Sequence, residues 1–293
     1  MKRHIKSIIV TGLILFIAAA LLVAGISYFY AEKNSFPSAG IYFAEHNSWL
    51  SWTDERYNPY FDLVLYEVKG EESFLEFSEM ALRDAEGNEY PLKDASIRTV
   101  FSDIFFASYR ITCVLDRQLL GGGETRLKEA VLSSPEGAEH SYSIGTVALF
   151  VGNQGTDSQL QFSSGTAESS VLNSYNIQVT NAGEDAVAIH EVLLGLDGIT
   201  VSEFGYYDED NRYCEFNGEI LLNEGESVIL HCAFTGAETY RQDPFTEIRP
   251  AFGYTAKGES CIASVSNTAE YFAAFTRQEI KDYLWGLYEG TAV

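Results

Sequence analysis

The chain has 293 residues, of which 42 are Asp or Glu and 19 are Lys or Arg, so its formal net charge at pH 7 is −23. This excess of acidic side chains argues against nucleic-acid binding, which requires a basic surface, and against a polybasic patch for anionic lipids. Hydrophobic residues make up 46% of the chain, which is typical of a folded protein and not of a disordered one.

The first predicted element is an uncharged apolar run over residues 8–30, which follows the basic residues Lys2, Arg3 and Lys6. As a helix this run is about 34 Å long at about 1.5 Å per residue, enough to cross a hydrocarbon core of about 30 Å. Because the basic flank lies on the N-terminal side, we expect a cytoplasmic N-terminus and an extracytoplasmic bulk. Residues 1–31 are thus interpreted as a cytoplasmic stub and a single-pass signal-anchor in the lipid bilayer of the cell membrane.

The alternative for this segment is a cleaved signal peptide. Its best cleavage candidate, Val23-Ala24-Gly25, lies inside the apolar run, which is longer than the stretch of about 7–15 residues in a typical signal peptide. A lipoprotein signal fails on chemistry, because Ile26 stands where a lipid-bearing Cys is required. The uncleaved anchor is therefore the favoured interpretation.

From residue 36 onward, apolar and polar residues alternate in the manner of β-strands. The first half predicts strands at 61–68, 75–83, 89–92, 97–101, 105–115, 127–132 and 142–151, and the second half at 175–180, 186–194, 199–204, 213–216, 220–222, 227–234 and 260–265. A polar stretch over 152–158 is the predicted linker. Short strands with turn residues between them predict an all-β ectodomain of two tandem antiparallel β-sandwich domains, immunoglobulin-like in style, at 36–152 and 158–275.

One element departs from the strand pattern at the C-terminal end of the chain. Thr276-Arg-Gln-Glu279 has the sequence of a capping box, and Ile280, Tyr283 and Leu284 follow at helical spacing. Residues 276–290 therefore predict a short amphipathic helix. Its apolar face either packs on its own domain or docks on a partner protein.

Four cysteines in an extracytoplasmic domain raise the question of disulfides. Cys113, Cys232 and Cys261 each share an alternating face with apolar residues, and a buried free Cys behaves as a small hydrophobic residue. If one disulfide forms, we favour Cys232 with Cys261, because both are expected to point inward from strands of the same half. Without a Cys-x-x-Cys pair, redox and structural-zinc sites have little support.

Two clusters are candidate ligand sites. Trp49, Trp52 and Tyr57 lie in an aromatic segment with polar neighbours, and flat rings beside polar groups suit a sugar or a peptide; the competing interpretation is a sandwich core with a covering loop. Asp208, Asp210 and Asn211 offer hard oxygen ligands for Ca²⁺, although the following residues depart from the EF-hand pattern and a solvated loop is the simpler interpretation.

Motifs of catalysis are missing from the sequence: it has no Gly-x-Ser-x-Gly elbow, no Ser-x-x-Lys pair and no two His residues at helical metal spacing. We therefore expect a membrane-anchored extracytoplasmic binding or accessory protein of a bacterial envelope, without catalytic activity and without a cofactor. Two alternatives stay open. One is a structural subunit that docks on a membrane or envelope partner through the C-terminal helix, and the other is a carbohydrate-active enzyme that uses paired carboxylates.

Overall fold

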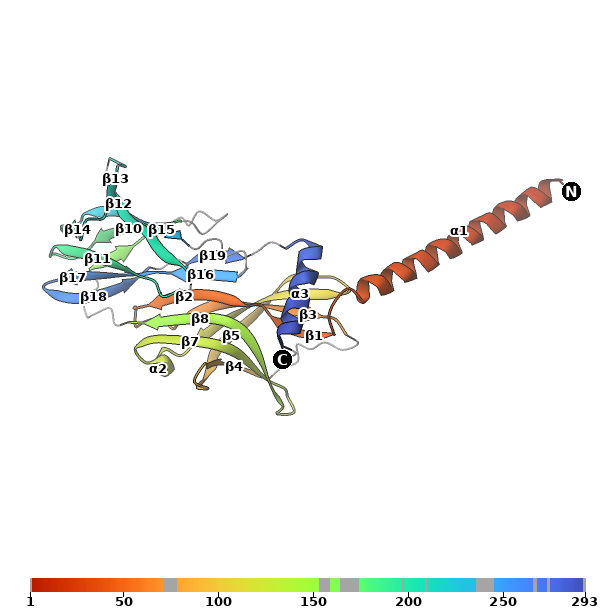
Figure 1. The fold of residues 1–293 in the computed structure, drawn as a ribbon, viewed down its shortest axis with the longest axis horizontal. Coiled ribbons are helices and arrows are strands. Elements are labelled where there is room, and N and C mark those ends of the chain that lie inside the picture. The colour runs from red at the N-terminus through yellow and green to blue at the C-terminus, as the bar shows by residue number, and fades with distance from the viewer. Residues whose placement is uncertain are drawn as a thin grey trace.

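An N-terminal helix, β-sheets and a C-terminal helix make up the chain, as the sequence predicts (Figure 1). The computed structural model describes residues 2–70, 78–152, 159–163, 174–196, 198–208, 210–235, 245–265, 268–272 and 275–291. The predicted linker at 152–158 lies, apart from Gly152, outside the described residues. The expectation of a mostly β chain between two terminal helices is confirmed.

The N-terminal helix, α1 (Lys2–Lys33), projects away from the body of the protein (Figure 1). It contains the segment Ile14–Lys33, which is long enough and apolar enough to cross a membrane. The large apolar side chains of this segment, such as Phe16 and Leu21, are exposed. A signal sequence near an N-terminus can meet the same criteria of length and composition, so the choice of an uncleaved anchor stays a prediction.

The largest sheet has ten described strands. Their spatial order is β1 (Gly40–Phe43), β3 (Tyr60–Val68), β6 (Phe106–Leu115), β5 (Glu89–Ser102), β4 (Glu79–Asp84), β7 (Gly123–Ser133), β8 (Glu139–Val151), β2 (His46–Trp52), β16 (Phe245–Arg249) and β19 (Ala269–Phe272). Leu63 of β3 and Ile111 of β6 belong to the same buried cluster as Leu127 of β7 and Leu149 of β8. The sheet therefore curls over one hydrophobic core.

β5 is one long strand where the sequence predicts two segments, 89–92 and 97–101. Its pairing with β6 shifts register between Leu92 and Asp94 and again between Thr99 and Phe101. Each such bulge bends a strand without ending it. The interruption of the alternating pattern therefore marks irregularities within one strand.

β2 departs from the expectation of antiparallel sheets. It is parallel to β8 on one side and parallel to β16 on the other, and all seven of its residues are buried. A parallel strand inside a sheet is typically covered on both faces, so its sequence does not alternate between apolar and polar residues. This accounts for the absence of a strand prediction at 46–52.

Two smaller sheets form the rest of the body. One contains β13 (Tyr213–Glu215), β12 (Thr200–Tyr207), β15 (Ser227–Thr235), β10 (Ser174–Asn181) and β9 (Leu160–Phe162), and the other contains β14 (Ile220–Leu222), β11 (Val187–Leu193), β17 (Ala251–Ala256) and β18 (Glu259–Ser264). Ile177 and Leu230 of the first sheet share a buried cluster with Ile189 and Phe252 of the second. Both sheets thus contribute to one core.

The two halves of the chain are joined by a change of sheet at Pro250. β16 ends at Arg249 in the large sheet, and β17 begins at Ala251 in a small one. Proline has no N–H group and cannot continue a ladder of hydrogen bonds, so it is suited to this crossing. Ser51 on β2 donates a hydrogen bond to the Pro250 carbonyl at 2.9 Å. β16 and β19 come from the predicted second domain but belong to the large sheet, whose other strands come from the first half. The domain boundaries at 36–152 and 158–275 stay a prediction.

The C-terminal helix, α3 (Arg277–Thr291), begins with the predicted capping box. The Glu279 N–H donates to Thr276 Oγ1 at 3.3 Å, and the Thr276 N–H donates to Glu279 Oε2 at 2.7 Å. Ile280 and Leu284 are buried in a cluster with side chains of the large sheet. The apolar face of α3 therefore packs on the β-sheet body of its own chain.

Candidate functional site

A cleft of about 680 Å³ lies where the two halves of the chain meet, and we call it the junction cleft. Residues of the first half that line it are Trp52, Asp54, Arg56, Tyr57 and Tyr60. Residues of the second half that line it are Leu160, Gln161, Phe162, Arg249, Ser264 and Val265. Most of these side chains lie at the ends of β2, β3, β16 and β18 or on the edge strand β9, so the sheets fix the walls of the cleft.

Aromatic rings form one side of the junction cleft. The rings of Trp52 and Tyr60 lie 4.7 Å apart at an angle of 59°, which is a close tilted contact. Trp52 is buried, whereas 46% of Tyr60 and 59% of Tyr57 are exposed. The Trp52 indole N–H has no hydrogen-bond partner in the part of the chain that the structure describes. The cleft therefore offers two solvent-exposed rings, and one of them, Tyr60, contacts the buried Trp52 ring.

Arg249 is the buried cation of the junction cleft. Its guanidinium carbon lies 3.7 Å from the centre of the Trp52 ring and 5.2 Å from that of Tyr60. Its Nη2 donates to Thr268 Oγ1 at 2.8 Å, which orients the guanidinium plane. Burial lowers the pKa of Arg249, and a hydrogen bond with Tyr60 opposes that shift. Arginine stays protonated in proteins, so Arg249 is a fixed positive charge stacked on an aromatic face.

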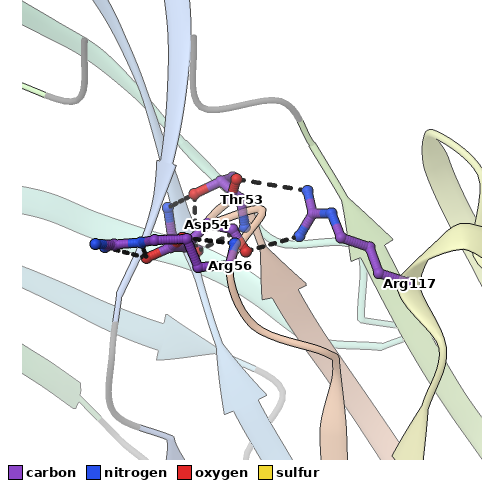
Figure 2. Close-up of polar contacts among 5 residues, drawn as sticks. Thr53, Asp54, Arg56 and Arg117 are labelled. Carbon is purple, nitrogen blue, oxygen red and sulfur yellow. Dashed lines mark hydrogen bonds and ion pairs between the residues drawn. The ribbon is translucent and has the colours of Figure 1, made fainter. Parts of the chain in front are cut away.

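The loop that follows β2 is held by two sets of hydrogen bonds (Figure 2). Arg117, on the short helix α2 (Arg117–Leu120), donates to the carbonyl oxygens of Trp52, Thr53, Asp54 and Gly152 at 2.6–3.4 Å. The backbone N–H of Thr53 donates to Ser264 Oγ at 3.0 Å, and the backbone N–H of Ser264 donates to Thr53 Oγ1 at 2.9 Å. This loop is therefore fixed against both halves of the chain.

Asp54 and Arg56 form an ion pair at the rim of the junction cleft. Nη2 of Arg56 lies 2.7 Å from Oδ2 of Asp54, and Nε of Arg56 donates to Oδ1 at 3.0 Å (Figure 2). The hydrogen bond from Arg56 lowers the pKa of Asp54 below its ordinary value, so the carboxylate stays charged. An exposed ion pair of this kind adds little to stability. It does place the N–H donors of the Arg56 guanidinium beside the acceptor oxygens of the Asp54 carboxylate.

The described lining of the junction cleft combines groups for stacking and hydrogen bonding with a single carboxylate. Asp54 is the one carboxylate among the described residues that line the cleft, and its pKa is lowered. A general acid needs a raised pKa, and glycoside hydrolysis needs a second carboxylate on the opposite side of the scissile bond. Flat rings, a fixed cation and paired polar groups instead allow stacking and oriented hydrogen bonding.

The structure separates the three predicted aromatic residues. Trp52 and Tyr57 line the junction cleft, whereas Trp49 is buried in the core, where its Nε1–H donates to Glu124 Oε2 at 2.9 Å and its ring stacks on Phe150. Sequence reasoning missed Arg249 and Gln161, which reach the cleft from the second half. Their positions depend on pairing between distant strands, for which the sequence carries no local signal.

The predicted calcium ligands lie in the turn after β12. Asp208 Oδ1 accepts a hydrogen bond from the Arg212 N–H at 2.9 Å, and Asp210 is ion-paired with the Arg212 side chain. Asn211 has a left-handed φ of 62°, a conformation that asparagine tolerates well in turns. Among the described residues, no group of three His, Cys, Asp or Glu side chains is placed to hold a metal ion. A calcium site at Asp208, Asp210 and Asn211 stays a prediction.

All four cysteines have free thiols in the structure. Cys113 and Cys232 are buried, and burial raises the pKa of both thiols, so they behave as small apolar side chains. Cys261 is half-buried on β18, and its Sγ contacts the Glu259 carbonyl oxygen. The pairing of Cys232 with Cys261 stays a prediction for the oxidised protein.

Comparisons with known proteins add no assignment. No protein-family model matches the chain, and no curated protein matches its sequence. The functional conclusion therefore depends on the residues and contacts described above.

Proposed function

We propose that the chain is a membrane-anchored binding protein of a bacterial envelope, whose junction cleft holds a carbohydrate ligand and which has no catalytic activity of its own. In this proposal α1 crosses the cell membrane once, the N-terminus is cytoplasmic and the β-sheets are extracytoplasmic. The observation that carries the proposal is the junction cleft itself, in which exposed Tyr57 and Tyr60 flank buried Trp52 and Arg249. The two halves are proposed to be tandem immunoglobulin-like sandwiches.

A carbohydrate fits the chemistry of the cleft better than an apolar molecule does. The apolar faces of sugar rings stack on aromatic side chains, and hydroxyl groups need both donors and acceptors in fixed positions. Arg56 supplies donors, Asp54 supplies acceptors, and the buried indole N–H of Trp52 lacks a partner among the described residues. The fixed loop between β2 and β3 keeps these groups in place without a ligand, which lowers the entropic cost of binding.

Docking of the C-terminal helix on a partner has less support. Ile280 and Leu284, the apolar residues that would form such an interface, are already buried against the ectodomain. A partner would have to bind the outer face of α3. The enzyme alternative has less support as well: Arg56 keeps Asp54 ionised, so Asp54 is unsuited to be a general acid, and no second carboxylate is among the described residues of the cleft.

Titration calorimetry of the full-length protein in detergent micelles tests the proposal. The ligands are neutral and acidic oligosaccharides of bacterial surfaces, and short peptides serve as the competing class. We expect an oligosaccharide to bind and Tyr57→Ala or Tyr60→Ala to weaken it about tenfold, because the loss of one stacked ring costs about 1.4 kcal/mol. Tyr213→Ala, on β13 away from the cleft, is the matched control and should leave the Kd unchanged.

Three results would contradict the proposal. Binding of peptides but of no oligosaccharide would overturn the ligand class. Equal affinities of the Tyr57→Ala and Tyr213→Ala variants would move the site away from the cleft. Hydrolysis of an oligosaccharide that is lost in Asp54→Asn would make the protein an enzyme.

A further inference from the structure

A second pocket lies at the end of the body that α1 enters, and we call it the anchor-side pocket. It has a volume of about 410 Å³ and lies between β3, β5 and β6 on one side and the start of α3 on the other. Its walls are mainly apolar, and they include Val64, Val100, Phe101, Phe106 and Ile280. It shares no lining residue with the junction cleft.

The anchor-side pocket lies next to the C-terminal end of α1, which contacts its wall. The ring of Phe106, in the pocket wall, lies 5.4 Å from that of Phe36, just after α1. The neighbouring Phe105 lies 5.4 Å from Phe29 of α1 itself. Glu32 of α1 accepts a hydrogen bond from Arg277, which also lines the pocket. The pocket therefore lies next to the end of α1 at which, in the proposed topology, the helix leaves the bilayer.

Exposed apolar side chains follow one another along β5 and the turn after it, and two of them, Val100 and Phe101, line the pocket. Ile97, Val100, Phe101 and Ile104 are 44–69% exposed, which is the densest run of exposed large apolar residues that the structure describes outside α1. The register shift between Thr99 and Phe101 allows two consecutive residues, Val100 and Phe101, to line the same pocket. Contiguous exposed apolar surface of this kind marks a contact with a protein, a membrane or a ligand.

The charged residues of the pocket already have partners within the chain. Arg110 Nη1 lies 3.3 Å from Asp62 Oδ2, and Arg277 is ion-paired with Asp103 and Glu32. Their charges are therefore balanced, and no excess charge is left to attract an anion. The pocket offers its occupant mainly apolar surface.

The size of the pocket decides between a lipid chain and a protein helix. A docked helix would present a row of side chains along several turns of about 5.4 Å each, whereas the anchor-side pocket is one compact volume. A volume of about 410 Å³ is instead at the lower end of the range for small-molecule sites, about 300–1,000 Å³. A single hydrocarbon chain satisfies both the size and the apolar walls.

We propose that the anchor-side pocket takes one acyl chain of a membrane lipid, drawn from the bilayer past Val100 and Phe101. This inference rests on the proposed insertion of α1 in the bilayer. It makes the ectodomain lie close to the membrane surface with one lipid held in its base. The junction cleft is independent of it, because the two sites have separate walls.

Fluorescence quenching in lipid vesicles tests the inference with the full-length chain. The protein is reconstituted in phosphatidylcholine vesicles with or without bromine atoms on one acyl chain, since bromine quenches a tryptophan that it contacts. Phe101→Trp reports on the pocket, and Ile17→Trp, in the middle of α1, reports on anchoring. Leu119→Trp, an exposed position on α2, is the matched control.

We expect brominated lipid to quench Phe101→Trp as strongly as Ile17→Trp and to leave Leu119→Trp no more quenched than the parent protein. Adding Ser108→Phe, which fills the pocket from its β6 wall, should remove the quenching of Trp at position 101. Quenching of Ile17→Trp alone would overturn the pocket and keep the anchor. If neither Phe101→Trp nor Ile17→Trp is quenched, both the pocket and the membrane anchor are overturned. If the quenching of Phe101→Trp survives Ser108→Phe, the residue contacts the membrane without an occupied pocket, and the inference is overturned.

Discussion

The guanidinium carbon of Arg249 lies 3.7 Å from the centre of the Trp52 ring, so the end of β16 is stacked on the end of β2. Both side chains are buried, and the two strands are neighbours in the large sheet although they come from opposite halves of the chain. A desolvated cation on an indole face contributes about 2 kcal/mol. This contact therefore holds the wall of the junction cleft and joins the two halves at once.

We predict that Arg249→Lys lowers the free energy of unfolding by about 1–3 kcal/mol. Lysine keeps the charge, but it cannot stack a planar group on Trp52 or bond Thr268 through two nitrogens as Arg249 does. Urea unfolding of the full-length protein in detergent, followed by tryptophan fluorescence, measures the change. Arg212→Lys, in an exposed pair with Asp210, is the control and should change the stability by less than about 0.5 kcal/mol.

Arg117 gives a second prediction, which concerns the loop after β2. Arg117→Gln removes a charged donor from four backbone carbonyl oxygens, so we expect a loss of about 1–3 kcal/mol in stability and weaker ligand binding in the junction cleft. Urea unfolding and calorimetry measure the two effects. Gln118→Ala, at the next exposed position of α2, should change neither. Equal behaviour of the two variants would show that the loop does not need Arg117.

His46 predicts a pH dependence of stability. Burial, with a smaller contribution from the charge of Arg110, lowers the pKa of His46 to about 3, and its Nε2 accepts a hydrogen bond from the Val64 N–H at 3.2 Å. The unfolded chain binds this proton near pH 6.5, whereas the folded chain stays neutral down to about pH 3. The His46 contribution to stability is therefore complete above pH 6.5 and is lost as the pH falls, at up to about 1.4 kcal/mol per pH unit.

The measurement is urea unfolding between pH 6.5 and 5.0, a window above the range in which most carboxylates titrate. In His46→Gln the amide oxygen still accepts the Val64 N–H, but no imidazole titrates, so the slope of stability against pH should be smaller than in the parent. A parent slope that persists in His46→Gln would contradict the assignment.

Leu284 tests whether α3 is part of the core. Its side chain is fully buried, so Leu284→Ala should destabilise the folded protein by about 2–5 kcal/mol through lost contacts and a new cavity. Leu221→Ala, at an exposed position on β14, should change the stability by less than about 0.5 kcal/mol. Thermal unfolding of the two variants compares them, and a stable Leu284→Ala protein would favour a helix that binds elsewhere.

Local patterns predicted the elements whose cause is local. The alternation in β10, with Tyr175, Ile177 and Val179 inward, is seen in the structure, where all three are buried. The capping box at Thr276 begins α3 as expected, because its two hydrogen bonds join residues three positions apart. These features need no information from distant parts of the chain.

β2 and β16 escaped prediction because their environment is set by distant strands. His46–Trp52 carries several polar residues, which are buried where alternation would expose them; Ser48 Oγ, for example, accepts the Glu247 N–H of β16 at 3.0 Å. β16 itself contains buried Glu247 and Arg249 and is followed by Pro250. The aromatic half of the junction cleft was therefore predictable from Trp52 and Tyr57, whereas its cation required the pairing of β2 with β16.

The place of β2 between β8 and β16 has a consequence for biosynthesis. The ribosome completes β1 to β8 long before residues 245–249 emerge, and until then one edge of β2 has no neighbour. An open strand edge invites pairing with other chains, and late long-range pairing slows folding. The nascent chain thus passes through an aggregation-prone interval that ends only when its C-terminal part arrives.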